Sequence, residues 1–196
     1  MRQFGHLIVN LLAIVVLGIG GGLGSAWYMV EAGSRLTTRS FGPWTTWIAA
    51  GRPDADPYTR ARTARNGLLP IASTLELSFY AKTDSDGDQL QSACDYAVTV
   101  EGLEGAWWDL AAFDRRGGVI PNGADRFTFS SDTAMREPDG RAVIVLARDA
   151  RPGNWLPVGA GKVTLALTVQ DAVLAAAVYA AGPIKPLPTI RKLGCR

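Results

Sequence analysis

The sequence predicts a mainly β protein: an antiparallel β-sandwich of the jelly-roll kind, preceded by one N-terminal transmembrane helix and one short α-helix. Three observations support this prediction. Residues 7–30 contain no charged side chain, and residues 73–169 alternate apolar and polar side chains in short runs. Turns rich in Gly, Asn and Asp separate these runs. Short strands at this spacing are typical of sandwiches, whereas a parallel α/β sheet would need helices between the strands.

Residues 7–30 are expected to form the transmembrane helix. At about 1.5 Å per residue this segment rises roughly 36 Å, which exceeds the ~30 Å hydrocarbon core of a bilayer. Trp27 and Tyr28 then lie at the headgroup level, where amphipathic rings are favoured. An uncleaved signal anchor over residues 1–30 is therefore favoured. The alternatives are a cleaved signal peptide, with Gly24-Ser25-Ala26 as the cleavage site, and a buried core helix, which the length and uniform hydrophobicity disfavour.

The rest of the chain is expected outside the cytoplasm, as a periplasmic domain of a single-pass inner-membrane protein. The segment before the apolar helix is very short, as in a signal sequence. Cys94 and Cys195 are the two cysteines, and such a pair forms a disulfide in an oxidising compartment. Two free thiols remain the alternative. Basic residues flank the helix on both sides and so give little orientation signal.

The anchor also contains the spacings Gly18-x-x-x-Gly22 and Gly20-x-x-x-Gly24. Glycines four residues apart let two membrane helices approach closely, which suggests a homodimer through the anchor. Glycine is common in membrane spans in any case. The expected partners are therefore the lipid bilayer, through residues 7–30, and a second copy of the helix.

A juxtamembrane linker is expected over residues 31–56 and the sandwich domain over residues 57–196. Asp56 and Pro57 are typical N-cap and first helical residues. They predict a helix over residues 58–69, ended by Pro70, with one apolar face formed by Ala61, Ala64, Leu68 and Leu69. Strands are expected over residues 73–79, 96–100, 107–113, 126–129, 142–146 and 163–169, followed by a helix over 171–181 and an extended, proline-rich exit.

Composition excludes several classes of function. The net charge of +2 is too small to indicate nucleic acid binding, and the arginines between Arg52 and Arg65 are typical of a solvated face. His6 is the one histidine and lies beside the anchor, so the body lacks the base of a Ser-His-Asp or Cys-His site. The acidic run Asp84–Asp88 departs from the calcium-loop pattern and is typical of a hairpin turn. No cofactor and no metal are expected.

One segment has the residue types of a ligand groove. On a strand, Trp107 and Trp108 point to opposite faces, so only one can join the core while the other covers a second surface or a groove. The structural alternative is a buried ion pair between Arg126 and Asp114, with amides that cap loop backbone. The candidate ligand-binding residues are Trp107, Trp108, Asp114, Asn122, Arg126, Asn154 and Trp155.

The same segment resembles a known family. The runs Trp107-Trp108-Asp109-Leu110, Phe113-Asp114, Gly117-Gly118, Ile120-Pro121-Asn122, Arg126-Phe127 and Asn154-Trp155-Leu156-Pro157 are similar to the DUF1214 domain. The lead-in Asp56–Ala61 and the turn Asp84–Gly87 resemble its short, membrane-anchored bacterial branch. The resemblance covers roughly residues 40–190 and implies a jelly-roll sandwich. It implies no mechanism, because the family is named for its unknown function. Larger relatives carry a preceding DUF1254 domain, which is not found in this sequence.

One position departs from the family pattern. Many members have Arg-x-Tyr-x-Pro late in the last strand, where this chain has Thr168-Val169-Gln170-Asp171-Ala172. A site formed by that Arg and Tyr would be altered here.

Together these observations predict a non-enzymatic envelope protein of unknown molecular function, which binds an envelope protein or glycan through the region of Trp108 and Trp155. The alternative is a hydrolase or lyase of an envelope glycan, with Asp109 or Asp114 as the base and Arg126 as the charge stabiliser. A third interpretation is a domain that serves an assembly of membrane proteins, with the anchor as the contact.

Overall fold

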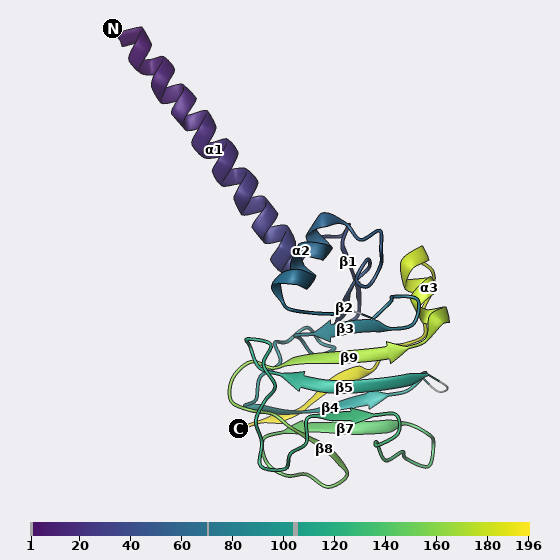
Figure 1. Cartoon of the computed structure of the whole chain (residues 1–196). Coiled ribbons are helices and arrows are strands. Elements are labelled where there is room, and N and C mark those ends of the chain that lie inside the picture. Colours follow the sequence, from purple (N-terminus) through teal and green to yellow (C-terminus); the bar gives the residue numbers. More distant parts are fainter. Residues whose placement is uncertain (1, 70, 104–105) are drawn as a thin grey trace.

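The computed structural model describes residues 2–69, 71–103 and 106–196, with side chains from His6 onward, and divides them into a long helix and a β-sandwich (Figure 1). Helix α1 (Arg2–Ala32) projects away from the sandwich as a single rod. Pro70, expected to end a helix, lies outside the described residues. The N-terminal helix and the mainly β body confirm the predicted fold class.

Helix α1 has no contact that buries its apolar length. The segment His6–Ala32 is strongly apolar, and none of its most apolar stretch is buried against the domain. A core helix of a soluble protein would bury this surface against the domain, so that alternative does not fit. By length and composition this is the one described helix able to cross a membrane.

Two sheets form the sandwich. The first has the strand order β1-β2-β3-β9-β5-β6 and the second β10-β4-β7-β8. All neighbours are antiparallel except β7 and β8, which are parallel. The first sheet comprises β1 (Thr38–Phe41), β2 (Trp44–Trp47), β3 (Leu77–Ala81), β9 (Thr164–Gln170), β5 (Trp107–Phe113) and β6 (Thr128–Ser130). The second comprises β10 (Thr189–Cys195), β4 (Cys94–Val100), β7 (Ala142–Ala147) and β8 (Asn154–Pro157).

The core lies between the two sheets. Strands β3, β9, β5, β4 and β7 each point alternate residues inward, as the period of two in the sequence predicts. The largest fully buried side chains are Trp44, Trp108, Tyr96, Phe79, Leu90, Leu110, Ile144, Leu146, Leu156, Leu165, Leu167 and Ile190.

Part of the segment expected to be a linker, strands β1 and β2, belongs to the first sheet. Strand β2 pairs with β3, and Trp44 on β2 is fully buried, with its indole Nε1 donating to the Pro188 carbonyl oxygen at 2.6 Å. The proline-rich exit likewise leads into β10, which pairs along β4. Both strands are short or irregular, and neither has the long alternation that reveals the other strands.

Helix α2 (Pro57–Arg65) begins where the sequence predicts and ends earlier. The Asp56 Oδ1 atom accepts hydrogen bonds from the backbone of Tyr58 and Thr59, so Asp56 is the N-cap. The helix ends at Arg65 because Gly67 adopts a left-handed φ of +62°, which a continued helix cannot accommodate. The expected extension to Leu69 is therefore wrong.

The buried side of α2 is also different from the expected one. Thr59 is buried, and Arg62 and Thr63 are partly covered, whereas Ala61 and Ala64 face outward. The apolar face predicted from the periodicity is thus the exposed face. Helix α3 (Ala172–Ala180) lies where the sequence predicts it, capped by Asp171.

Cys94 and Cys195 form a disulfide in the structure. The two residues lie opposite each other across the pair β4–β10 and are 101 positions apart in the sequence. The bond therefore ties the final strand to the middle of the second sheet.

Candidate functional site

The two adjacent tryptophans lie on opposite faces of β5. Trp108 is only 1 % exposed and lies in the core between the sheets. Trp107 is 38 % exposed, and its indole Nε1 donates to Asp132 Oδ2 at 3.0 Å. Trp108 therefore cannot line a surface groove: it is a core residue, and this corrects its place among the ligand-binding candidates.

Asp114 and Asn122 hold loop backbone. Asp114 Oδ1 accepts hydrogen bonds from the backbone N–H groups of Arg116, at 2.7 Å, and Gly118, at 2.8 Å. Asn122 Oδ1 accepts from the backbone of Ala124 and Arg126, and its Nδ2 donates to the Arg126 carbonyl oxygen at 2.9 Å. These are the bonds of Asx turns, which stabilise a local bend without any ligand.

The ion pair that we expected between Arg126 and Asp114 is not formed. The Arg126 guanidinium donates to the Trp155 carbonyl oxygen at 3.3 Å and lies 5.4 Å from the centre of the Phe129 ring. The Asp114 carboxylate instead accepts hydrogen bonds from the backbone of its own turn. The expectation of amides that cap backbone is correct, and the expectation of a buried salt bridge is wrong.

Asn154 and Trp155 begin strand β8. The buried carboxamide of Asn154 accepts from the Met135 N–H at 2.7 Å and donates to the carbonyl oxygens of Met135 and Val143. Trp155 is partly exposed, and its Nε1 donates to the Ala147 carbonyl oxygen at 3.0 Å. These bonds fix the parallel strand β8 against β7. Trp107, Arg126 and Trp155 keep some exposed surface, so their role in ligand binding stays a prediction.

Asp109 is the other carboxylate considered for catalysis. It lies half-buried on β5, and this burial raises the pKa of its carboxyl group, an effect partly offset by a hydrogen bond from Thr128. The Asp114 carboxylate lies in a turn, and neither group forms an ion pair with Arg126 among the described residues. The structure thus does not assemble the proposed base and charge stabiliser.

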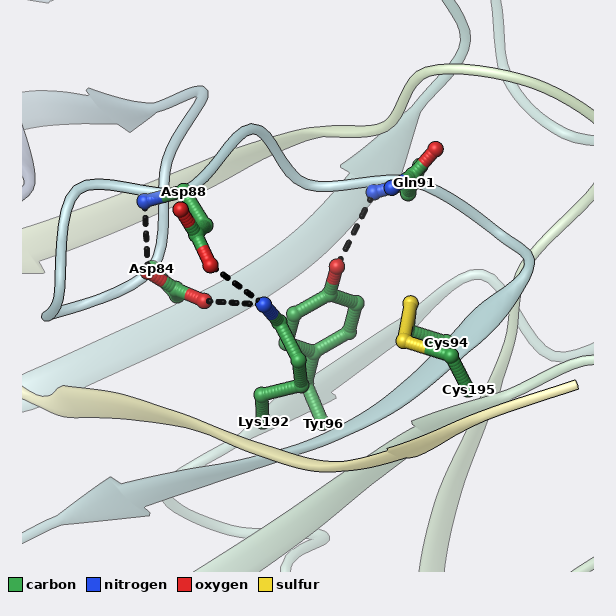
Figure 2. The surroundings of a disulfide bond; sticks show 7 residues. All are labelled: Asp84, Asp88, Gln91, Cys94, Tyr96, Lys192 and Cys195. Carbon is green, nitrogen blue, oxygen red and sulfur yellow. Dashed lines mark hydrogen bonds and ion pairs between the residues drawn. A yellow bond between two sulfur atoms is a disulfide. The ribbon is translucent and has the colours of Figure 1, made fainter.

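The acidic turn packs against a lysine (Figure 2). Asp84 is buried, and its Oδ1 accepts from the backbone of Asp86 and Asp88, as in a tight turn. The Lys192 ammonium lies 2.5 Å from Asp88 Oδ2 and 3.8 Å from Asp84 Oδ2. The hydrogen bond to Asp88, together with the charge of Asp84, holds the pKa of Lys192 above its ordinary value. Lys192, on β10, thus supplies a positive charge next to the carboxylates of Asp84 and Asp88.

A hollow lies elsewhere, between α2 and the outer face of β3. It has a volume of about 160 Å³, and a smaller hollow of about 40 Å³ adjoins it. Neither is lined by a residue of the motif segment, residues 107–127 and 154–157, whose sequence resembles DUF1214. The larger hollow combines polar and aromatic side chains, among them Trp47, Thr59, Arg62, Glu76, Ser78 and Tyr80. Sequence reasoning missed this site, because its residues come from the expected linker, the short helix and one strand.

Helix α2 also connects the sandwich to α1 (Figure 1). The Arg62 guanidinium donates to the Glu31 carbonyl oxygen at 2.8 Å, at the C-terminal end of α1, where unpaired carbonyls attract cations. The Arg65 guanidinium lies 3.8 Å from the centre of the Trp27 indole and pairs with the Glu31 carboxylate at 2.7 Å. A solvated face is expected for these arginines, but Arg62 and Arg65 contact α1 and hold it against the domain.

Comparison with known proteins decides the family. A family model described as a protein of unknown function, DUF1214, matches residues 76–173, which is half of the chain. The chain belongs to the DUF1214 family. The matched segment of this DUF1214 protein begins at β3 and ends in α3, so it contains the motif segment and most of the sandwich. It does not contain α1 or α2.

The fold is similar to that of the VPA0106 protein from Vibrio parahaemolyticus. The TM-score is 0.62 at 15% sequence identity, and the match covers 94% of this chain and 46% of the Vibrio chain. This DUF1214 protein therefore spans less than half the length of that relative. An uncharacterised protein from Burkholderia cenocepacia matches 62% of this chain and 30% of its own, with a TM-score of 0.39 at 20% identity. No curated protein matches the sequence.

Proposed function

We propose that this DUF1214 protein is a single-pass protein of the bacterial inner membrane, whose sandwich is a non-enzymatic binding module on the periplasmic side. One observation supports the anchoring above all others: the most apolar stretch of α1 is not covered by the domain. Such a surface is stable in lipid and not in water. The disulfide Cys94–Cys195 supports an oxidising compartment for the domain.

The binding module is proposed to use the hollow between α2 and β3. A ligand pocket combines an apolar lining with a few placed polar groups. The hollow has Trp47 and Tyr80 as aromatic walls, and Arg62 and Glu76 as charged groups of opposite sign. A small ligand with both polar and apolar parts fits this lining. Carboxylate catalysis receives no comparable support from the positions of Asp109 and Asp114.

Reporter fusions test the orientation. Alkaline phosphatase fused after Arg196 is active only when it is exported, and a fluorescent reporter that folds in the cytoplasm gives the opposite result. We expect the phosphatase fusion of the full chain to be active and the same fusion lacking residues 2–32 to be inactive. An inactive full-length phosphatase fusion beside a bright fluorescent fusion would overturn the proposed side of the membrane.

Native mass spectrometry of the protein released from membranes tests the hollow. We expect a retained small molecule on the wild-type chain and its loss from Ser78→Trp, whose indole fills the hollow. Ser130→Trp places the same side chain on β6, away from the hollow, and should keep the bound molecule. The same adduct on all three chains, or on none, would contradict the proposed site.

A further inference from the structure

An exposed apolar edge follows the last turn of α2. Ala61 and Ala64 lie on the outward side of the helix, and Leu68 and Leu69 follow in the loop. Leu69 is 95 % exposed and Leu36, in the turn after α1, is 87 % exposed. Contiguous apolar side chains on the outside of a domain mark a surface that another phase or molecule covers.

The depth of this edge follows from α1. If the apolar segment begins at Leu7, the ~30 Å hydrocarbon core is crossed after about 20 residues of helix, close to Trp27. The Arg65 guanidinium stacks on the Trp27 ring and pairs with Glu31. The C-terminal end of α2 therefore lies at the level of the lipid headgroups, and Leu68 and Leu69 follow within four residues.

The charged residues of α2 itself are all positive, although Asp54 and Glu31 lie near Arg60 and Arg65. Helix α2 contains three arginines and no acidic residue between Pro57 and Arg65. Arg60 is exposed and donates to the Pro53 carbonyl oxygen, and Arg35 is exposed in the turn after α1. Within the described part of the chain, neither guanidinium forms a salt bridge with a carboxylate. Cations next to an apolar edge are the pattern that anionic lipid headgroups attract.

We propose that Arg35, Leu36, Arg60, Leu68 and Leu69 form a second membrane contact, the junction face, which lies on the headgroups of the leaflet where α1 emerges. This inference rests on the proposed anchoring by α1. Leu69 enters the interface and the two arginines face lipid phosphates. The sandwich then contacts the bilayer at two places, α1 and the junction face, which restricts its motion relative to the membrane. Because Leu68 and Leu69 also line the hollow, its mouth opens at the lipid surface.

Fluorescent labels on the full chain in nanodiscs test this contact. The paired Cys94 and Cys195 leave one added cysteine free for an environment-sensitive dye. The probe position is Leu69→Cys. Met135→Cys, which is 61 % exposed beside the far strand β8, is the matched control, and Leu12→Cys reports on α1. Nanodiscs contain phosphatidylcholine with or without phosphatidylglycerol, and some lipids carry a shallow or a deep spin-label quencher.

We expect the Leu69 dye to shift to the blue and to be quenched several-fold more by shallow spin labels than the Met135 dye. The added changes Arg35→Gln and Arg60→Gln should reduce this quenching in anionic nanodiscs more than in neutral ones. Water-like emission at both Leu69 and Met135, with the Leu12 dye quenched by deep labels, would overturn the junction face and leave the anchor intact. Loss of quenching at Leu12 would instead overturn the anchoring.

Discussion

The motif segment and the α1–α2 junction use their polar and aromatic side chains in opposite ways. In the motif segment, the polar groups of Asp114, Asn122 and Asn154 bind the chain's own backbone, and Trp108 is buried. At the junction, Arg65 contacts the exposed Trp27, and large apolar side chains face outward. The polar groups of Asp114, Asn122 and Asn154 are therefore used within the chain, whereas the residues of the proposed junction face lie outside the matched segment 76–173.

The largest expected effect separates the two adjacent tryptophans. Trp108→Ala leaves a large cavity in the core and should lower the free energy of unfolding by about 3–5 kcal/mol. Trp107→Ala removes a partly exposed ring with one hydrogen bond and should cost about 1 kcal/mol or less. Urea unfolding of both variants, solubilised in the same detergent, measures the difference. Equal costs would show that the motif does not stabilise the core as described.

Reduction of the disulfide should have the next largest effect. The bond closes a loop of about 100 residues, and its loss should cost about 2–5 kcal/mol because the unfolded chain gains conformational freedom. Thermal unfolding with and without a reductant checks this. The double variant Cys94→Ser/Cys195→Ser serves as the control, since a reductant should not change its Tm. A wild-type Tm that is insensitive to reductant would contradict the prediction.

The sequence predicted these stabilising elements unevenly. Strands with long alternation, such as β3, β5 and β9, were found because burial of one face imposes a period of two. Strands β1, β2, β8 and β10 are short or contain Gly and Pro, so their pairing depends on partners distant in sequence. The face of α2 was assigned wrongly for a related reason: Thr59 and Arg62 turn inward because Asp56, Glu31 and Trp47 offer them partners.

The candidate site was less predictable than the fold. The aromatic and polar composition of residues 107–126 indicated a groove, but the same side chains satisfy turns and core in the structure. The hollow between α2 and β3 arises where three separate segments meet, which no local pattern reveals. A structural residue differs from a ligand-binding one in that its hydrogen-bonding groups are already used within the chain. Asn154 is an example of a structural residue.

Asn154→Ala should cost about 2–3 kcal/mol, since it leaves buried backbone groups of Met135 and Val143 without partners. Asn122→Ala, in a more exposed loop, should cost about 1 kcal/mol. Chemical unfolding ranks the two variants. If the Asn122 variant were the less stable one, the start of β8 would not depend on the Asn154 carboxamide.

The smallest effect concerns pH. Burial raises the pKa of Asp109 above the ordinary value of 3.8, so the folded state retains this proton to higher pH than the unfolded state. Asp109 therefore destabilises the fold increasingly as the pH rises above that value. Asp109→Asn, which resembles the protonated form, should gain stability relative to wild type between pH 3 and pH 7, by a small rise in Tm. A difference that stays constant or reverses with pH would contradict this.

Alkaline carbonate extraction tests most directly whether α1 spans the bilayer. The membranes come from cells that produce the chain with an epitope after Arg196. Carbonate removes proteins held at the surface and leaves those that span the bilayer. If α1 stays attached and crosses the membrane, the epitope remains in the pellet. Release of the epitope into the supernatant would contradict the account.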